Sequence, residues 1–248
     1  MTAQYVEADS PGPELEIAHR GTITAIRQET PTTRSFLIEC GDCRYLPGQW
    51  LKLQVPLAGG AAVGVYSIAS SPWQAGVIQL VVKQGQGHPV TRYLHEGARV
   101  GDRVRLSSGQ GSFCYRAGMG SPVVLIGAGA GVAPLLGILR YIDRAEPSQP
   151  VALVYSVPTP EEFLFADELR AMAERHPRVR LFFTVTRPEG TAWSGRTGRI
   201  DRTLLEAAGA DPKAVHFICG PNAMVDASAE LLASMGIPSE QVVYEKWW

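Results

Sequence analysis

The sequence predicts two domains of different fold class, an antiparallel β-barrel followed by a five-stranded parallel α/β domain. Three observations support this prediction. The first half of the 248 residues contains short strands broken by glycine and proline, whereas apolar strands alternate with helices after residue 121. A glycine-rich turn at residues 127–131 joins the first of these later strands to a helix. With 45% hydrophobic residues, the chain is long enough to bury a core in each domain.

The barrel is expected in residues 14–117, after a flexible arm at residues 1–13. In residues 50–55, Leu51, Leu53 and Val55 alternate with Lys52 and Gln54, as in a strand with one buried face. Residues 77–82 and 104–106 continue this pattern. Strands at such short intervals are typical of a small antiparallel barrel or sandwich.

The α/β domain is expected in residues 121–248, after a boundary where glycine and small residues accumulate. Five strands are predicted at residues 123–127, 151–156, 179–186, 215–220 and 242–246. Helices are predicted between them at residues 134–145, 162–175, 201–208 and 222–235. Strands joined by crossover helices lie parallel in one sheet, so this half predicts a nucleotide-binding architecture.

The glycine turn is the motif with the clearest chemistry. Gly127, Gly129 and Gly131 leave the backbone N–H groups uncovered, and Pro134 opens the following helix. A pyrophosphate can approach these groups and the positive end of the helix dipole. Two other interpretations stay open. The spacing GxGxGxxP differs from GxGxxG, as in a turn used only for packing, and the uncharged residues 117–139 resemble a membrane span interrupted by glycine and proline.

Charge and composition exclude several partners. The formal net charge is −1, so the chain has no overall basic character for binding nucleic acid or an anionic membrane. The first 18 residues contain acids but no Lys or Arg, which fits neither a secretory signal nor a transit peptide. We therefore expect a cytoplasmic protein without nucleic-acid or membrane partners.

Four cysteines are too few and too scattered for a disulfide framework. Cys40 and Cys43 form a CxxC pair, but no second pair or CxxH follows at zinc-finger spacing, so we expect incidental surface thiols and no metal site. The cysteine spacing of a plant-type iron–sulfur cluster is also absent. Electrons handled by this chain must therefore pass to a separate acceptor.

Several further motifs occur in a characteristic order along the chain. They are residues 47–49 (PGQ), 65–72 (VYSIASSP), 108–113 (SGQGSF), 127–134 (GAGAGVAP), 219–221 (CGP) and 245–248 (EKWW). In this order they resemble the ferredoxin–NADP reductase superfamily over most of the chain. Within it, the flavin strand without arginine and the EKWW ending resemble the group of oxidoreductase NAD-binding domain-containing proteins.

The resemblance implies FAD, with FMN as the alternative, and NAD(P)H as cofactors. Tyr66 would present a flat face to the flavin, Ser67 would hydrogen-bond the flavin N5, and Thr91 would lie near the flavin phosphate. Cys219 would lie against the nicotinamide C4. Glu245 resembles the carboxylate that hydrogen-bonds the serine, so Ser67, Cys219 and Glu245 are the expected catalytic residues.

The other expected cofactor contacts come from the remaining motifs. Trp247 takes the place of an aromatic residue near the flavin, and Thr186 and Arg187 resemble a ribose-binding pair. Arg196 and Arg199 follow and slightly favour NADPH over NADH. The full expected set is Tyr66, Ser67, Thr91, Gly127, Gly129, Gly131, Pro134, Thr186, Arg187, Cys219, Gly220, Pro221 and Trp247. Each of these residues also has an alternative interpretation as a core, capping or solvent-exposed residue without a role in cofactor binding.

Two positions depart from the family pattern. Position 64 is glycine where the flavin strand usually has arginine, and Pro158 stands where many relatives have arginine. Loss of one charge-assisted contact predicts flavin binding weaker by about tenfold to a hundredfold. Arg92 is a candidate replacement, and Gly64→Arg is expected to tighten binding if the strand tolerates the side chain.

These features predict a flavin oxidoreductase that transfers hydride from NAD(P)H to flavin and then electrons to a separate acceptor such as a redox protein. A flavin reductase with diffusible flavin as its substrate is the first alternative. A nucleotide-binding module without redox turnover is the second. The sequence does not choose the acceptor, between NADH and NADPH, or the oligomeric state.

Overall fold

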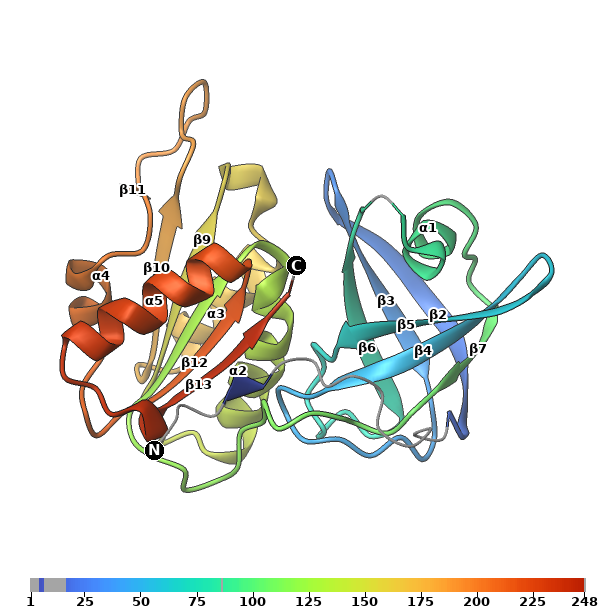
Figure 1. Ribbon diagram of the computed structural model, residues 1–248, viewed down its shortest axis with the longest axis horizontal. Coiled ribbons are helices and arrows are strands. Elements are labelled where there is room, and N and C mark those ends of the chain that lie inside the picture. Colours follow the sequence, from blue (N-terminus) through green and yellow to red (C-terminus); the bar gives the residue numbers. More distant parts are fainter. Residues whose placement is uncertain (1–4, 7–16, 86, 248) are drawn as a thin grey trace.

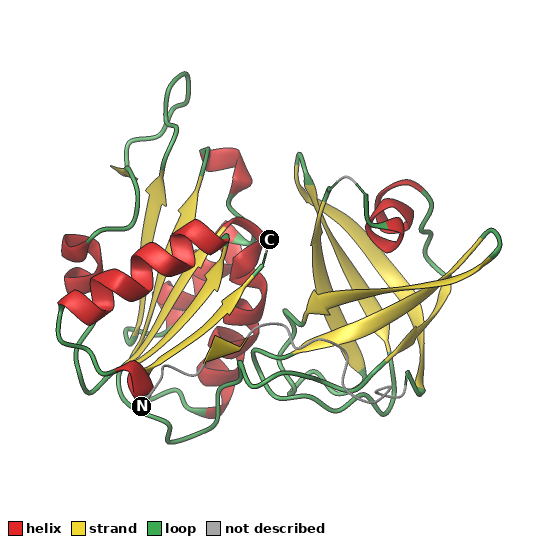
Figure 2. Cartoon of the chain, viewed as in Figure 1, coloured by secondary structure: helices red, strands yellow, loops and turns green. Residues whose placement is uncertain are grey.

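The computed structural model describes residues 5–6, 17–85 and 87–247 of the chain. Two halves lie side by side, a closed antiparallel sheet and a parallel sheet with helices on both faces (Figures 1 and 2). The predicted fold class is confirmed. Every helix of these described residues is too short or too polar to span a bilayer.

The first half is a six-stranded barrel with the strand order β5-β4-β7-β2-β3-β6. Its elements are β2 (His19–Thr30), β3 (Thr33–Glu39), β4 (Trp50–Leu57), β5 (Gly60–Ser67), β6 (Val77–Lys83), α1 (Pro89–Glu96) and β7 (Arg103–Leu106). An isolated bridge between Ile68 and Leu80 joins the ends of the sheet. Leu51, Leu53 and Val55 are fully buried, so the predicted alternation in β4 is confirmed.

The second half is a parallel sheet with the strand order β1-β13-β12-β8-β9-β10-β11. Its five main strands are β8 (Val123–Ala128), β9 (Val151–Val157), β10 (Val179–Val185), β12 (Val215–Gly220) and β13 (Val242–Lys246). All five were predicted, whereas two-residue strands at the edges, β1 (Tyr5–Val6) and β11 (Arg196–Thr197), were not. Apart from β1, the predicted arm at residues 1–13 lies outside the described residues.

Four α-helices cover this sheet: α2 (Val132–Ala145), α3 (Ala166–Arg175), α4 (Arg202–Ala208) and α5 (Asn222–Ser234). Short 3₁₀ turns are η1 (Gly129–Gly131), η2 (Pro160–Glu162) and η3 (Ser239–Gln241). α2 begins before the predicted start because η1 leads directly into it. α3 begins four residues later than predicted because Phe165 adopts a left-handed backbone conformation, with a φ of 55°.

Helix α2 attaches the second half to the barrel. A Cβ at Gly137 would lie 2.9 Å from the Ile68 carbonyl oxygen, so only glycine allows the helix this close to the barrel. One turn later, Arg140 donates from Nη1 to the Ala69 carbonyl oxygen at 2.8 Å and to Gln79 Oε1 at 2.6 Å. Its Nε and Nη2 atoms pair with the Glu168 carboxylate of α3. The guanidinium therefore connects α2, α3 and the barrel.

The segment after β7, which joins the two halves, packs against the α/β half. Phe113 and Tyr115 are buried against Phe217 of β12, with ring centroids 5.4 and 6.2 Å away. These residues precede the predicted boundary but share the core of the α/β half. We propose to keep the division into residues 14–117 and 121–248, with Phe113 and Tyr115 as the part of the first domain that docks on the second.

We expect Arg140→Met to lower the free energy of unfolding by about 3 kcal/mol, because it removes charged hydrogen bonds at a site that is largely shielded from water. Chemical denaturation followed by tryptophan fluorescence measures this change. Arg144→Met, on the exposed side of α2, is the matched control. Equal destabilisation by the two variants would show that Arg140 does not hold the halves together.

Candidate functional site

The candidate site lies where the connectivity of the parallel sheet reverses. β8 has β9, the next strand of the main sheet in sequence, on one side and β12, a later strand, on the other. Open α/β sheets bind ligands at this switch point, beyond the carboxyl ends of the strands. Here Gly127 of β8 pairs with Cys219 of β12, and Cys219 pairs with Glu245 of β13. The topology therefore brings three predicted site positions into one row.

Each glycine of the turn meets a different constraint. A Cβ at Gly127 would lie 2.7 Å from Leu135 Cδ1, and one at Gly131 would lie 2.5 Å from the Cys219 carbonyl oxygen. Both glycines therefore allow close packing, the second against the Cys219–Gly220 backbone. Gly129 differs, because its φ of 52° favours glycine and no atom lies within 4 Å of its Cβ position. This open cradle at the start of α2 fits a dinucleotide phosphate.

Cys219 and Glu245 are buried together beside this cradle. Burial and the neighbouring Glu245 carboxylate raise the pKa of the Cys219 thiol well above its ordinary value, so the thiol is neutral. Burial also raises the pKa of Glu245 to about 7. Trp247 Nε1 donates to Glu245 Oε2 at 2.8 Å, whereas the buried Oε1 has no partner among the described residues. That acceptor fits a polar group of a bound cofactor.

Trp247 and the CGP turn complete this part of the site. The Trp247 amide donates to the Gly220 carbonyl oxygen at 3.2 Å, and its ring packs against the core shared with the barrel. The carboxyl end of β13, which leads to Trp247, points toward the barrel side of the sheet (Figure 1). Pro221 is exposed at the N-cap of α5, whereas Pro134 is buried in the first turn of α2.

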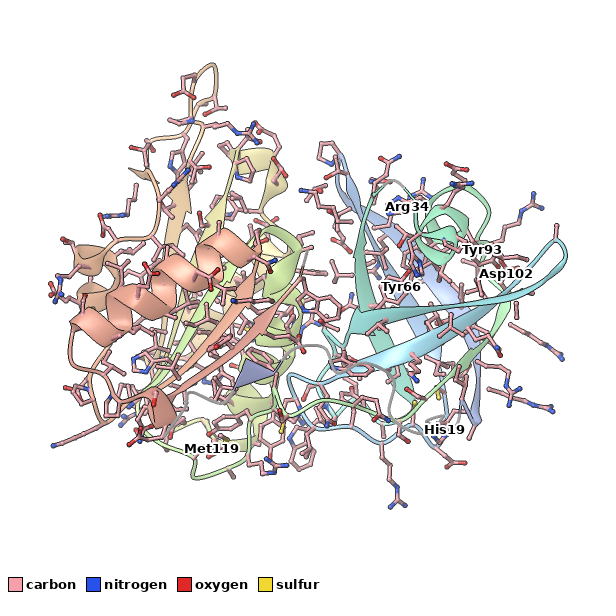
Figure 3. The ribbon with its side chains drawn as sticks, in the orientation of Figure 1. His19, Arg34, Tyr66, Tyr93, Asp102 and Met119 are labelled. Carbon is pink, nitrogen blue, oxygen red and sulfur yellow. The ribbon has the colours of Figure 1, made fainter. Side chains whose placement is uncertain are left out.

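On the barrel, the structure joins Tyr66 to Thr91. Tyr66 lies below α1 (Figure 3). Its hydroxyl lies 3.0 Å from Thr91 Oγ1, in the first turn of α1, and burial raises the pKa of Tyr66. Ser67 ends β5, opposite Trp50. The Ser67–Glu245 hydrogen bond implied by the resemblance is not formed between the described residues, because Glu245 Oε2 is bonded to Trp247 and Oε1 has no partner.

The surroundings of Gly64 explain why this position has no side chain. A Cβ there would lie 2.7 Å from Tyr66 Cε2, 2.9 Å from the Tyr66 hydroxyl and 3.0 Å from His88 Cε1. A side chain at position 64 therefore requires the Tyr66 ring and the His88 ring to move. Sequence reasoning missed His88, although its place directly before the helix-opening Pro89 is a usable signal.

Thr186 and Arg187 lie apart from these residues, exposed at the carboxyl end of β10. Their backbone amides donate to the carbonyl oxygens of Val157 and Pro158, which fixes this loop against the end of β9. Arg196 forms an ion pair with Asp201, so it is less available for a phosphate than the sequence suggested. Arg199 is exposed nearby.

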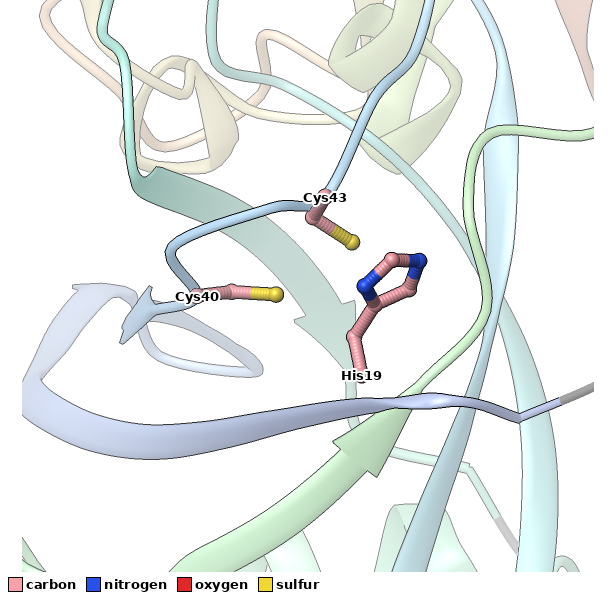
Figure 4. A group of neighbouring side chains, drawn as sticks. All are labelled: His19, Cys40 and Cys43. Carbon is pink, nitrogen blue, oxygen red and sulfur yellow. The ribbon is translucent and has the colours of Figure 1, made fainter.

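The prediction that Cys40 and Cys43 are surface thiols is wrong. Cys40 is buried and Cys43 is half-buried. His19, at the start of β2, lies beside both sulfur atoms (Figure 4). The sequence could not show this neighbour, because the pairing of β2 with β3 brings together residues that are distant in the chain.

Comparison with known proteins finds a separate family match for each half of the chain. An oxidoreductase FAD-binding domain matches residues 22–115, and an oxidoreductase NAD-binding domain matches residues 125–230. Ferredoxin–NADP reductase B of Sorangium cellulosum is 31% identical over 235 residues, covering 91% of this chain and 96% of that protein. The chain belongs to the ferredoxin–NADP reductase superfamily. It is an NAD(P)H-dependent flavin oxidoreductase, and its cofactors are FAD and NAD(P)H.

Some other members of the superfamily are larger. The reductase component of propane 2-monooxygenase from Mycolicibacterium smegmatis is 28% identical, and the match covers 90% of this chain but 67% of that protein. An Amycolatopsis cytochrome P450 reductase has a TM-score of 0.82 and 27% identity, covering 92% of this chain and 69% of its own. A ferredoxin NADP+ reductase from Neisseria gonorrhoeae with bound FAD and NADP shares the fold, with a TM-score of 0.78 at 24% identity.

We expect Glu245→Gln to stabilise the flavin-free protein at high pH. Because folding raises the pKa of this carboxyl from about 4.5 to about 7, the wild type loses stability as the pH rises through this interval. The neutral glutamine avoids that loss, so the variant gains about 3 kcal/mol at pH 9 and less than about 1 kcal/mol at pH 5. Urea denaturation at both pH values measures this, with the exposed Glu240→Gln as control. A gain that does not depend on pH would contradict it.

We expect Gly64→Arg to weaken FAD binding by about tenfold, or about 1.4 kcal/mol, because its Cβ displaces Tyr66 from Thr91. Fluorescence titration with FAD and riboflavin measures both affinities. Ala61→Arg places the same charge at an exposed position of β5 and is the control. Tighter binding of FAD with unchanged binding of riboflavin would instead mean that the new guanidinium reaches the phosphate.

Proposed function

We propose that this oxidoreductase receives hydride from NAD(P)H on FAD and delivers electrons one at a time to a separate iron–sulfur protein. The observation that carries the proposal is the buried row Gly127, Cys219 and Glu245 at the switch point, at the carboxyl ends of the parallel strands. Bound FAD accepts a hydride and can release single electrons, which is the chemistry that the cofactor supplies.

The second domain would position the nicotinamide dinucleotide. Its pyrophosphate would contact the backbone at Gly129 and the N-terminus of α2, where the cradle is open. The uncharged Cys219 side chain would pack against the nicotinamide. Glu245 would hold or release a proton at Oε1, since its pKa of about 7 makes both states accessible near neutral pH.

The barrel would position the flavin. The Tyr66 ring would stack on it, Ser67 would face N5, and Thr91 with the first turn of α1 would hold the phosphate. Trp247 would contact the flavin from the second domain. Contacts of Thr186 and Arg187 with the adenosine ribose are part of the proposal, and the exposed Arg199 slightly favours NADPH.

The acceptor class follows from the relatives and from this chain's cysteines. The relatives include a ferredoxin–NADP reductase and reductase components of oxygenases. In this chain Cys114 and Cys219 lie apart from the Cys40–Cys43 pair, so the four cysteines do not form the spacing of a ferredoxin cluster. Free thiols agree with a reducing compartment, and we place the protein in the cytoplasm.

A second function is favoured by Gly64. Without a charged side chain at this position, FAD or FMN can dissociate after reduction and act as a diffusible substrate. The two functions differ in whether the flavin remains on the protein during turnover. Gel filtration of the reduced protein separates them.

We expect NADPH or NADH to bleach the flavin absorbance in an anaerobic stopped-flow experiment, followed by reduction of an added ferredoxin. Gly131→Ala should raise the half-saturating NAD(P)H concentration by about tenfold, because the new Cβ pushes the turn away from Cys219. FAD content should not change. Gly85→Ala, where a Cβ meets no atom within 4 Å, is the control. No bleaching by either nucleotide would overturn the proposed function.

A further inference from the structure

Three potential metal ligands meet at the end of the barrel remote from the flavin-side pair Tyr66 and Thr91. His19 begins β2, Cys40 follows the last residue of β3, and Cys43 lies in the turn after it. One imidazole nitrogen and the two sulfur atoms all lie within 4.8 Å of one another (Figure 4). In Figure 3, His19 lies near the lower end of the barrel and Tyr66 lies higher, below α1, so this cluster is separate from the Tyr66–Thr91 pair.

We propose that His19, Cys40 and Cys43 bind a thiophilic metal ion, with Zn²⁺ as the fitting member of this class. Two thiolates and one imidazole are the donors that such ions select. Ligands at about 2.3 Å (sulfur) and 2.0 Å (nitrogen) around a tetrahedral zinc lie within about 4 Å of each other. Separations of up to 4.8 Å require a contraction of at most about 1.3 Å to reach this geometry. This fits two residues of a short turn facing one side chain.

The histidine is already oriented for this role. Its Nε2 lies 2.9 Å from Ser108 Oγ, so Nδ1 is the ring nitrogen directed at the sulfur atoms (Figure 4). A metal-binding histidine commonly uses its second nitrogen in a hydrogen bond that fixes the ring and its tautomer. Ser108 provides that partner here.

The cysteines are held by the surrounding backbone. The Cys40 amide donates to the Gly76 carbonyl oxygen at 2.8 Å, a bond that metal binding leaves intact. The Cys43 thiol donates to the Ser107 carbonyl oxygen at 3.2 Å, and a metal ion would replace this proton. The Gly109 amide donates to the Arg44 carbonyl oxygen, which joins the turn to the segment after β7. A bound ion would therefore tie together the start of β2, the turn after β3 and the segment after β7.

Charge and access also fit a divalent ion. Two thiolates neutralise its charge, so a partly buried site carries no net charge. A hollow of about 350 Å³, lined in part by Cys40, Cys43, Tyr45 and Gln74, opens beside the two cysteines. It gives an ion a route in and leaves the fourth coordination position to water. Metal binding would release the two thiol protons.

The test uses the full-length, reduced protein under anaerobic conditions, with Co²⁺ as a spectroscopic probe and Zn²⁺ as its competitor. We expect one Co²⁺ per chain, a thiolate-to-cobalt absorption band, and tetrahedral bands at wavelengths beyond the flavin absorption. Zn²⁺ should remove these bands and raise the melting temperature. X-ray absorption of the zinc form should show two sulfur ligands at about 2.3 Å.

Variants identify the ligands. Cys40→Ser, Cys43→Ser and His19→Gln should each lower the affinity by at least about a hundredfold, and Ser108→Ala by about tenfold to a hundredfold. Cys114→Ser and His176→Gln replace the same residue types elsewhere and should leave binding unchanged. His19→Gln keeps the test decisive if a cysteine variant does not fold.

Two outcomes would overturn the proposal. One is a reduced protein that binds no Co²⁺ through thiolate, including a protein whose Cys40 and Cys43 form a disulfide that resists reduction. The other is binding that survives all three ligand variants. Neither depends on FAD or NAD(P)H, so the result is independent of the proposed redox function.

Discussion

The close contact between α2 and the barrel is the constraint on which the arrangement of both cofactor sites depends. The N-terminus of α2 lies at the glycine turn, while Gly137 and Arg140 contact the barrel segment at Ile68 and Ala69, directly after Ser67. From Val132 to Gly137 a helix rises about 8 Å. One rigid helix therefore sets the distance between the nucleotide cradle and the flavin strand. Arg140 fixes its rotation, because the guanidinium contacts the barrel and α3 together.

At the sheet edge, burial controls the chemistry. Cys219 and Glu245 are adjacent in register on parallel strands, and the same low-polarity environment raises both pKa values. The thiol stays neutral, while the carboxyl titrates near neutral pH. The bond from Trp247 opposes part of the effect by favouring the ionised carboxylate. Removal of water by a bound cofactor would strengthen every electrostatic interaction within this row.

The sequence predicted the five main strands of the second half because each is an apolar run flanked by turn residues. Helix starts were less accurate, since η1 and the left-handed Phe165 are set by local backbone geometry that composition does not encode. Cys219 and Glu245 are adjacent because β12 and β13 are neighbouring strands, and the CGP and EKWW motifs mark the ends of these two strands. The contacts of Gly64 depend on the Tyr66 side-chain conformation and on the packing of α1. The approach of His19 to the CxxC pair depends on strand pairing in the barrel, which a single sequence does not specify.

Glycine at position 64 also affects how flavin retention responds to ionic strength. Dissolved ions weaken the attraction between a surface guanidinium and a phosphate, because they screen charges over a distance of about 8 Å under physiological conditions. An aromatic face and a hydroxyl group, as at Tyr66 and Thr91, lose little to such screening. A flavin held mainly by these neutral groups, as proposed, would be retained nearly as well at high ionic strength as at low ionic strength.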